Sequence, residues 1–118
     1  MAKVGTVFQI VPDGGNHFWI VISKEKRGMV LAVNSTDATK CPDSPCKINI
    51  GDHPAIIKPS AIIYRYAREF VSSKIDELCA KGSYLRQLDD CSPEVVKRIV
   101  AGAKQADDLT LKLLDYLK

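Results

Sequence analysis

The side chains best suited to proton transfer are the two histidines. His17 follows a Gly-Gly turn and opens an apolar segment, and His53 lies in the turn formed by residues 51–54 (GDHP). Because an imidazole exchanges protons near neutral pH, either histidine could serve as an acid or a base. The alternative is a hydrogen-bonded surface residue for His17 and a turn-forming residue for His53.

Candidate contacts to a phosphate group are Thr36, Arg65 and Arg68, with Ser35 beside Thr36. A guanidinium presents a fork of N–H donors that fits phosphate oxygens, and a hydroxyl can donate to the same group. The two arginines are predicted on opposite faces of a strand, where surface ion pairs are the alternative. Thr36 could instead bond its own backbone in a loop. These side chains together would suit phosphate-ester chemistry.

Short strands must position these residues, because β-branched and aromatic segments alternate with turn residues through the first half of the chain. We expect strands over residues 6–11, 18–23, 29–34, 46–50 and 61–68, with a charged turn at 24–28 and a loop over 35–45. The strand at 18–23 is nearly all apolar, so both its faces should be covered. The short turn pairs it with the next strand as an antiparallel hairpin, which brings His17 close to Ser35 and Thr36.

The spacing of apolar residues changes to a helical period near Ser72. A first helix should end at Gly82, and a second, short one is possible over residues 84–88. The sequence Ser92-Pro93-Glu94 is a strong start signal for a closing helix that extends to about Leu117. Gly102 within it either weakens the helix or marks a close packing contact.

The order of these elements indicates a single α+β domain spanning residues 1–118, with a small half-open antiparallel barrel followed by helices. Hydrophobic residues make up 46% of the chain and charged residues 26%, and the formal charge is +3. This mildly basic balance suits an RNA substrate or an acidic partner without requiring either. High apolar content in so short a chain favours a homodimer.

No apolar run approaches the roughly 18 residues that a membrane span needs, and the N-terminus lacks an apolar signal segment. We therefore expect a cytoplasmic protein. The four cysteines are Cys41, Cys46, Cys79 and Cys91. Their spacing lacks the short knuckles of zinc ribbons, so we expect free thiols and no metal. A disulfide between Cys41 and Cys46 is the alternative in an oxidising compartment.

Four segments, in order and spacing, resemble the MazF/PemK-like toxin family, best between residues 17 and 70. Residues 17–23 (HFWIVIS) occupy the place of the family's R-P-x-V-V-x-S strand, and residues 33–36 (VNST) look like its V-x-x-T segment. Residues 51–54 (GDHP) and 64–68 (YRYAR) resemble its G-x-V-x-x-D-Q-x-R region. The tail from Ser92 resembles the family's closing helix.

The resemblance implies an SH3-like barrel over about residues 4–70 and a helical tail over about 72–118. It also implies a dimeric, metal-independent endoribonuclease that uses no cofactor, cleaves single-stranded RNA and is neutralised by an antitoxin protein. In that reaction the ribose 2′-hydroxyl attacks the adjacent phosphate. Such chemistry needs a base, an acid for the leaving 5′-oxygen, and groups that stabilise the charged phosphorane.

Two family positions differ in this chain. His17 stands where the family's strand opens with Arg, and Tyr66 stands where the later segment has Asp. Carried over residue by residue, the resemblance implies that His17, Thr36 and Arg65 are catalytic. It implies that Arg68, His53 and Ser35 bind the substrate. The alternative is a catalytically silent member that uses the same fold to bind protein or nucleic acid.

Overall fold

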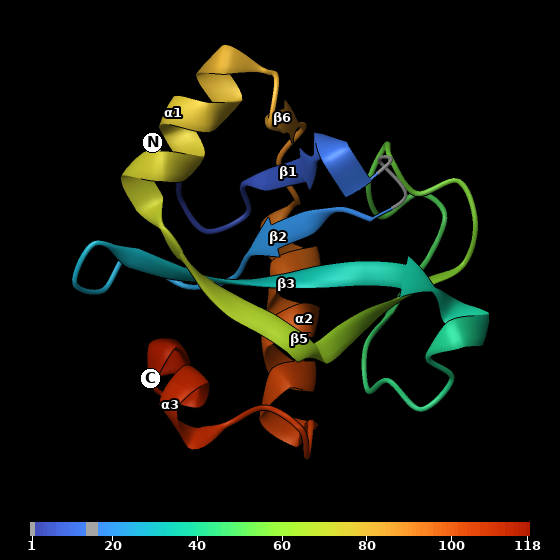
Figure 1. Cartoon of the computed structure of the whole chain (residues 1–118). Coiled ribbons are helices and arrows are strands. Elements are labelled where there is room, and N and C mark those ends of the chain that lie inside the picture. The colour runs from blue at the N-terminus through green and yellow to red at the C-terminus, as the bar shows by residue number, and fades with distance from the viewer. Residues whose placement is uncertain (1, 14–16) are drawn as a thin grey trace.

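The computed structural model describes residues 2–13 and 17–118 and contains a six-stranded antiparallel sheet with helices on both faces (Figure 1). The strands are β1 (Val7–Ile10), β2 (Trp19–Val21), β3 (Met29–Asp37), β4 (Lys47–Ile48), β5 (Ser60–Val71) and β6 (Leu85–Leu88). Their order across the sheet is β4-β5-β3-β2-β1-β6. The α+β class agrees with the prediction. The sheet is open, however, because its edge strands β4 and β6 do not pair with each other.

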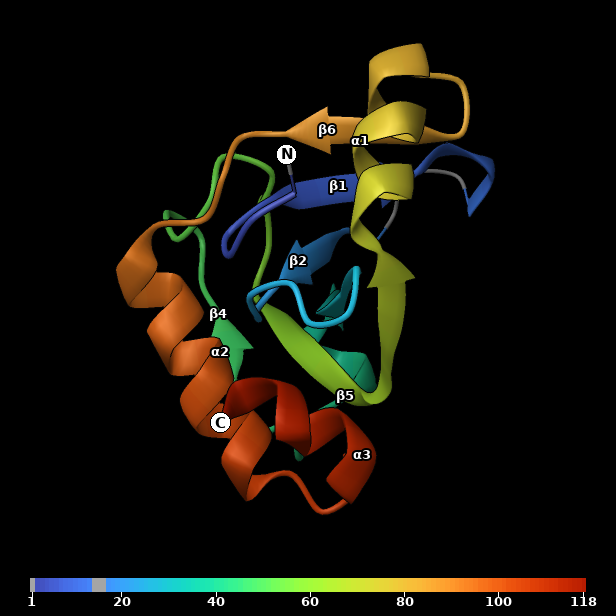
Figure 2. The same ribbon diagram turned by 90° about the vertical axis from the view of Figure 1, so that its left-hand side faces the viewer.

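Helices cover the two faces of this sheet separately. They are α1 (Ser72–Lys81), α2 (Pro93–Gln105) and the short α3 (Leu111–Leu114), with 3-10 turns at Val11–Asp13, Ala38–Lys40 and Asp115–Leu117. Figure 2 shows α1 and α2 on opposite sides of the strands. Ile75 of α1 packs with Trp19, whereas Ile99 of α2 packs with Ile20. Neighbouring side chains of β2 thus enter two different cores, which explains why this strand is apolar throughout.

The structure corrects three of the sequence predictions, two of them through strand pairing. Residues 85–88 form β6 rather than a helix, because Leu85 and Leu88 pair with Ile10 and Val7 of β1. The tail after residue 72 is therefore not helical throughout. The predicted loop from residue 35 begins later, since β3 extends to Asp37 by pairing with the start of β5. The closing helix is also interrupted: α2 ends at Gln105 and α3 begins after a new cap at Thr110.

A bulge in β5 overturns the predicted alternation along this strand. Ala32 of β3 pairs with Arg68 and Asn34 pairs with Ile63, so two steps on β3 correspond to five on β5. The three extra residues bend β5 sharply, as Figure 1 shows. Because of this bulge, Arg65 and Tyr66 are both exposed, although they are neighbours in the chain.

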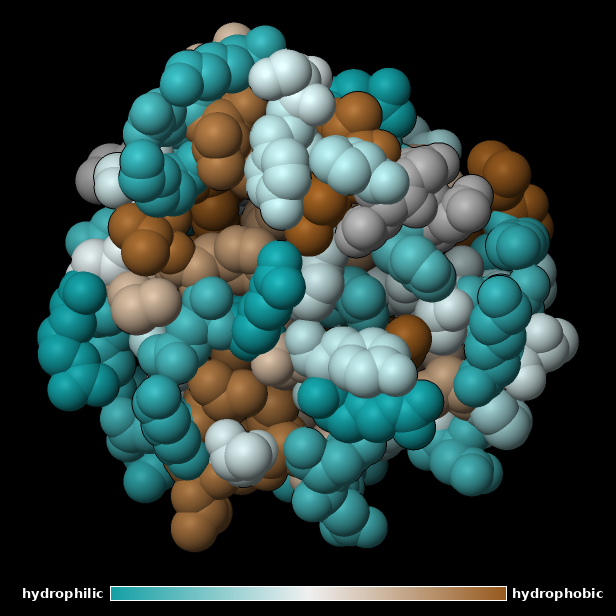
Figure 3. Space-filling model, in the orientation of Figure 1, coloured by the Kyte–Doolittle hydropathy of each residue, from teal (hydrophilic) through white to brown (hydrophobic). Residues whose placement is uncertain are grey.

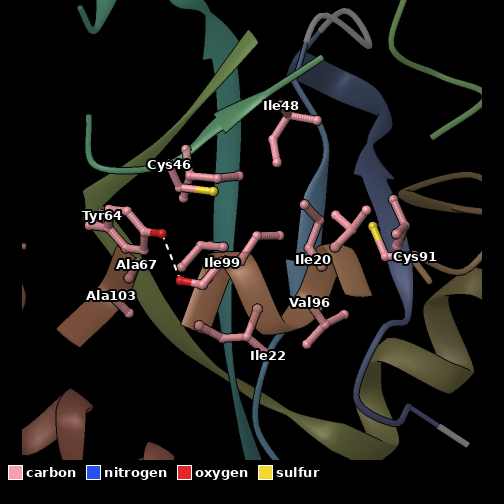
Figure 4. Packing of buried hydrophobic residues seen from close by; sticks show 14 of the residues in the cluster. Ile20, Ile22, Cys46, Ile48, Tyr64, Ala67, Cys91, Val96, Ile99 and Ala103 are labelled. Atoms are coloured by element: carbon pink, nitrogen blue, oxygen red, sulfur yellow. Dashed lines mark hydrogen bonds between the residues drawn. The ribbon is translucent and has the colours of Figure 1, made fainter. Parts of the chain in front are cut away.

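Helix α2 packs tightly against the sheet where it crosses β5 (Figure 4). The buried Tyr64 hydroxyl donates a 2.7 Å hydrogen bond to the backbone oxygen of Ile99. Gly102 lies beneath the tyrosine ring, and a Cβ atom there would stand 3.0 Å from Cβ of Cys46 and closer still to the Tyr64 oxygen. Gly102 therefore marks a close packing contact, one of the two alternatives that the sequence left open.

We predict that the ion pair between Arg98 of α2 and Asp52 stabilises the protein only above acid pH. Two guanidinium nitrogens bind the two carboxylate oxygens at 2.9 and 3.1 Å, and this hydrogen bonding lowers the pKa of Asp52. The contribution is complete above the unfolded pKa of about 3.9 and is lost as the pH falls through the lower folded value. Because Arg98 is 36% exposed, we expect less than about 1 kcal/mol.

Urea unfolding of the parent chain and of Asp52→Asn measures this effect. The free energy of unfolding of the variant should be lower than that of the parent chain at pH 7, and this difference should be smaller at pH 3. An equal difference at both pH values would show that it does not come from the carboxylate charge.

Candidate active site

A hollow of about 380 Å³ opens where β2 begins and β3 ends, beside the loop that leads into β5. Its polar lining residues are Gln9, His17, Ser35, Thr36, Asp37, Lys40, Lys58 and Ser60. Its apolar lining residues are Phe18, Ala55, Ile56 and Ile57. Three of the residues singled out from the sequence, His17, Ser35 and Thr36, are therefore brought together by the fold.

The register of the β2–β3 hairpin explains why His17 lies close to Ser35 and Thr36. Trp19 pairs with Asn34 in the antiparallel ladder, so the same register continued by two residues sets His17 opposite Thr36. The backbone N–H of Ser35 still donates to the Phe18 oxygen at 3.1 Å, which shows that the pairing persists beyond the end of β2. Directly opposed residues project from the same face of a sheet. His17 and Thr36 are therefore neighbours on the face that carries Trp19.

A backbone hydrogen bond selects the proton position on His17. Nδ1 of His17 lies 2.8 Å from the carbonyl oxygen of Ser35. A carbonyl can only accept, so Nδ1 carries the proton and Nε2 of the neutral ring has a free lone pair. The side chain is half-buried and lines the hollow. The ring is thus held in the tautomer that a general base requires.

The hollow carries one paired lysine and one unpaired lysine. Lys58 lies 3.1 Å from the Asp37 carboxylate. The backbone N–H of Thr39, its hydroxyl and then Lys58 lower the pKa of Asp37 to about 2, so this carboxylate stays ionised at neutral pH and cannot donate a proton. Lys40 is exposed and, within residues 2–13 and 17–118, has neither a hydrogen-bond nor an ion-pair partner. It is the cation of the hollow that can bind an anion.

Arg65 and Arg68 lie outside this hollow. Arg65 lines a second one of about 460 Å³, with Lys40 on its border and with Asp43, Asp107 and Asp108 also in its lining. The Arg65 guanidinium stacks over the Tyr66 ring, 5.0 Å from its centroid. Arg65 therefore does not line the hollow of His17 and Thr36, the two residues with which the resemblance groups it as catalytic. The bulge in β5 turns Arg65 away, and Lys40 occupies the position of the nearby cation.

His53 has a structural environment. It is buried, its Nδ1 accepts a 3.0 Å bond from the Ala55 N–H, and its Nε2 lies 2.5 Å from the carbonyl oxygen of Asp89. Its ring stacks on Phe18 with centroids 5.7 Å apart. Since both nitrogens are occupied by the backbone, His53 supports Phe18 and the following loop and has no nitrogen left for a substrate.

The thiols are poorly suited to chemistry at this site. All four cysteines are free, and burial raises the pKa of Cys46, Cys79 and Cys91, to about 11 for Cys91. Reactive cysteines have lowered values instead. In the described part of the chain, His, Cys, Asp and Glu side chains form no group of three that could hold a metal ion.

Sequence reasoning missed Lys40, Lys58 and Asp37. Lys40 lies in a polar segment that reads as a loop, and nothing in its spacing relates it to His17. The sequence indicates its position in one way: the third strand must end near Thr36, so the residues that follow Thr36 lie close to that end of the strand. Only the path of the chain after Asp37 returns Lys40 to the hollow.

No model of a known protein family matches this chain, and no curated protein matches its sequence. No helix in residues 2–13 and 17–118 is long and apolar enough to cross a membrane. The fold and site define an α+β domain with a hollow of about 380 Å³ that is lined largely by polar side chains.

Proposed function

We propose that this chain is a cytoplasmic, toxin-like endoribonuclease that cleaves single-stranded RNA without a metal ion and is neutralised by an antitoxin protein. The observation that carries the proposal is the His17 imidazole, whose Nδ1 is fixed at the Ser35 carbonyl so that Nε2 has no hydrogen-bond partner in the described part of the chain, beside Thr36 and Lys40 in one hollow. A base, a hydroxyl donor and a cation in one hollow are what attack of a 2′-hydroxyl on a phosphate requires.

In the proposed reaction, Nε2 of His17 takes the proton of the ribose 2′-hydroxyl, and the 2′-oxygen forms a bond to phosphorus. The hydroxyl of Thr36 and the ammonium group of Lys40 stabilise the added negative charge on the phosphate oxygens. The bond to the 5′-oxygen breaks, and Lys40 supplies the proton that this oxygen takes up. The products are a 2′,3′-cyclic phosphate and a free 5′-hydroxyl.

The resemblance to MazF/PemK-like toxins supports the same proposal. In this interpretation the open sheet, with its sharply bent β5, is an SH3-like barrel that has not closed. His17 replaces the arginine of the family strand as the group nearest the phosphate, and Lys40 supplies the positive charge that the replacement removes. Arg65 then contributes from the neighbouring hollow that shares Lys40.

The proposal is tested with purified chain and a pool of fluorescent RNA oligonucleotides in the presence of a chelator. We expect shortened products that end in a 2′,3′-cyclic phosphate, detected by mass. A substrate with 2′-deoxyribose at the cleavage position should stay intact, because it lacks the nucleophile. An intact RNA pool at micromolar protein, or equal cleavage of the deoxy substrate, would contradict the mechanism.

We also propose a homodimer. Several large apolar side chains remain exposed, including Ile57, at 82% exposure on the rim of the hollow, and Ile50, at 64%. Burying such side chains against a second copy would be favourable. A solution mass twice that of the chain at high micromolar concentration is expected, and a monomer at that concentration would contradict the proposal.

A catalytically silent binding module is the second candidate. The observation that favours it is the shortage of proton donors: His53 is engaged by the backbone and Asp37 is held ionised, so Lys40 alone must protonate the leaving oxygen. A lysine is a weak acid at neutral pH. RNA binding without cleavage in the assay above would favour this candidate.

A further inference from the structure

Lys40, the lysine of the hollow that has no partner in the described part of the chain, lies on a single 3-10 turn. This turn spans Ala38–Lys40 and follows directly after β3. None of its three residues is buried, and in Figure 3 mainly hydrophilic side chains cover the side of the molecule where β3 ends. So short a turn has little stability of its own. The position of the Lys40 ammonium group therefore depends on the polar groups that hold the turn.

Asp37 holds this turn through its side chain. Its Oδ1 accepts the backbone N–H of Thr39 at 2.9 Å and the hydroxyl of the same residue at 2.7 Å, which makes Asp37 the N-cap of the turn. Two further bonds come from the backbone. The Ala38 N–H donates to the Pro59 oxygen at 3.1 Å, and the Cys41 N–H closes the turn on the Ala38 oxygen at 3.3 Å. The Asp37 side chain thus doubles the number of bonds that hold the turn.

The second carboxylate oxygen of Asp37 binds the other lysine of the hollow. Oδ2 lies 3.1 Å from the ammonium group of Lys58. Because the Lys58 side chain is 62% exposed, this ion pair adds little stability. Its effect is instead on charge, since it neutralises Lys58 and leaves Lys40 as the cation available to an anion. One carboxylate therefore holds the turn of the first lysine and compensates the charge of the second.

We propose that Asp37 is a positioning residue, which acts through Lys40 by holding its ammonium group beside His17 and Thr36. This inference rests on the proposed function. In that reaction Lys40 stabilises charge on the phosphate and also protonates the leaving oxygen, so its placement affects both steps. Hydrogen bonding lowers the pKa of Asp37 to about 2, so this carboxylate cannot supply the proton itself. Its contribution is the cap on the turn.

Two variants that remove the same charge isolate the cap. Asp37→Asn keeps an oxygen that can accept from the Thr39 N–H, and asparagine caps about as well as aspartate. It should retain the kcat of the parent chain, whereas Asp37→Ala should have a kcat about 2- to 30-fold lower than Asp37→Asn, the equivalent of losing a cap. In a Lys40→Ala background both variants should cleave equally, because the positioned group is gone. Thermal unfolding checks that each variant is folded.

Either of two results would overturn the positioning role while leaving the proposed cleavage intact. One is an equal kcat for Asp37→Ala and Asp37→Asn when Lys40 is present. The other is a difference between them that persists in the Lys40→Ala background, which would mean that Asp37 does not act through Lys40.

Inorganic phosphate separates this inference from the proposed cleavage. Titration followed by NMR at the Lys40 side chain should show binding to Asp37→Asn about 2- to 30-fold tighter than to Asp37→Ala. Hydrogen exchange of the Cys41 N–H, which closes the turn, should be faster in Asp37→Ala alone. These differences in a chain that does not cleave RNA would support the positioning role and refute the proposed function. Equal phosphate affinities, or no binding to the parent chain at millimolar phosphate, would overturn the positioning role.

Discussion

Replacing His17 with alanine should reduce RNA cleavage by at least about 100-fold, the usual lower bound for the loss of a general base. The imidazole offers Nε2 as a basic nitrogen in the hollow, because the 2.8 Å bond to Ser35 sets the tautomer of the neutral ring. The side chain is half-buried and lies before β2 begins. The substitution should therefore lower the cleavage rate without a large loss of folding stability. Rates under single-turnover conditions and thermal unfolding measure the two effects on the same samples.

The second histidine provides the contrast. His53→Ala removes a buried ring that bonds the backbone at Ala55 and Asp89 and stacks on Phe18. We expect the main effect of that variant to be a loss of about 2–3 kcal/mol in the free energy of unfolding. Its cleavage activity should fall only in proportion to the unfolded fraction. If His17→Ala kept the parent rate, the imidazole would not be the base, and the silent-module interpretation would replace the enzyme.

Gly102→Ala should destabilise the protein by up to about 2 kcal/mol, even though alanine is the better helix former. Alanine gains about 1 kcal/mol in a helix, but overpacking a filled core costs about 1–3 kcal/mol. The new methyl group would collide with the Tyr64 hydroxyl and press on Cβ of Cys46. Tyr64 cannot move away freely, because it is buried and bonded to Ile99. Urea unfolding at neutral pH measures the loss.

A double-mutant cycle identifies the cause. Tyr64→Phe should cost about 1 kcal/mol by itself through the lost hydrogen bond, and it removes the oxygen that the new methyl group would meet. Gly102→Ala should then cost clearly less in the Tyr64→Phe background than in the parent chain, which gives a coupling of about 1 kcal/mol. Gly102→Ala with equal or higher stability than the parent would mean that α2 shifts easily on the sheet.

Local signals in the sequence predicted several elements well. The Ser92-Pro93 start is the N-terminus of α2, where the Ser92 hydroxyl accepts from the Val95 N–H at 3.3 Å. Gly82 ends α1 in the left-handed region, with φ at 73°. The β2–β3 hairpin is present as predicted. Each of these features depends on residues within a few positions of one another, so composition and spacing are sufficient to predict it.

Pairings between distant segments decided the rest. Residues 84–88 have no strong local preference, and their strand exists because β1 offers a free edge. The bulge of β5 arises because this strand pairs with β3 both before and after its bend. The alternation of apolar and polar residues along the sequence gives no sign of that bend.

The candidate site shows the same division. His17, Ser35 and Thr36 were predictable because one hairpin joins them. Lys40 lines the hollow only because the chain turns back after β3, where the segment after Asp37 contacts the residues that lead into β5. The pattern within a short segment determines which side chains one hairpin brings together. The position of Lys40 relative to His17 depends instead on contacts between segments that are far apart in sequence.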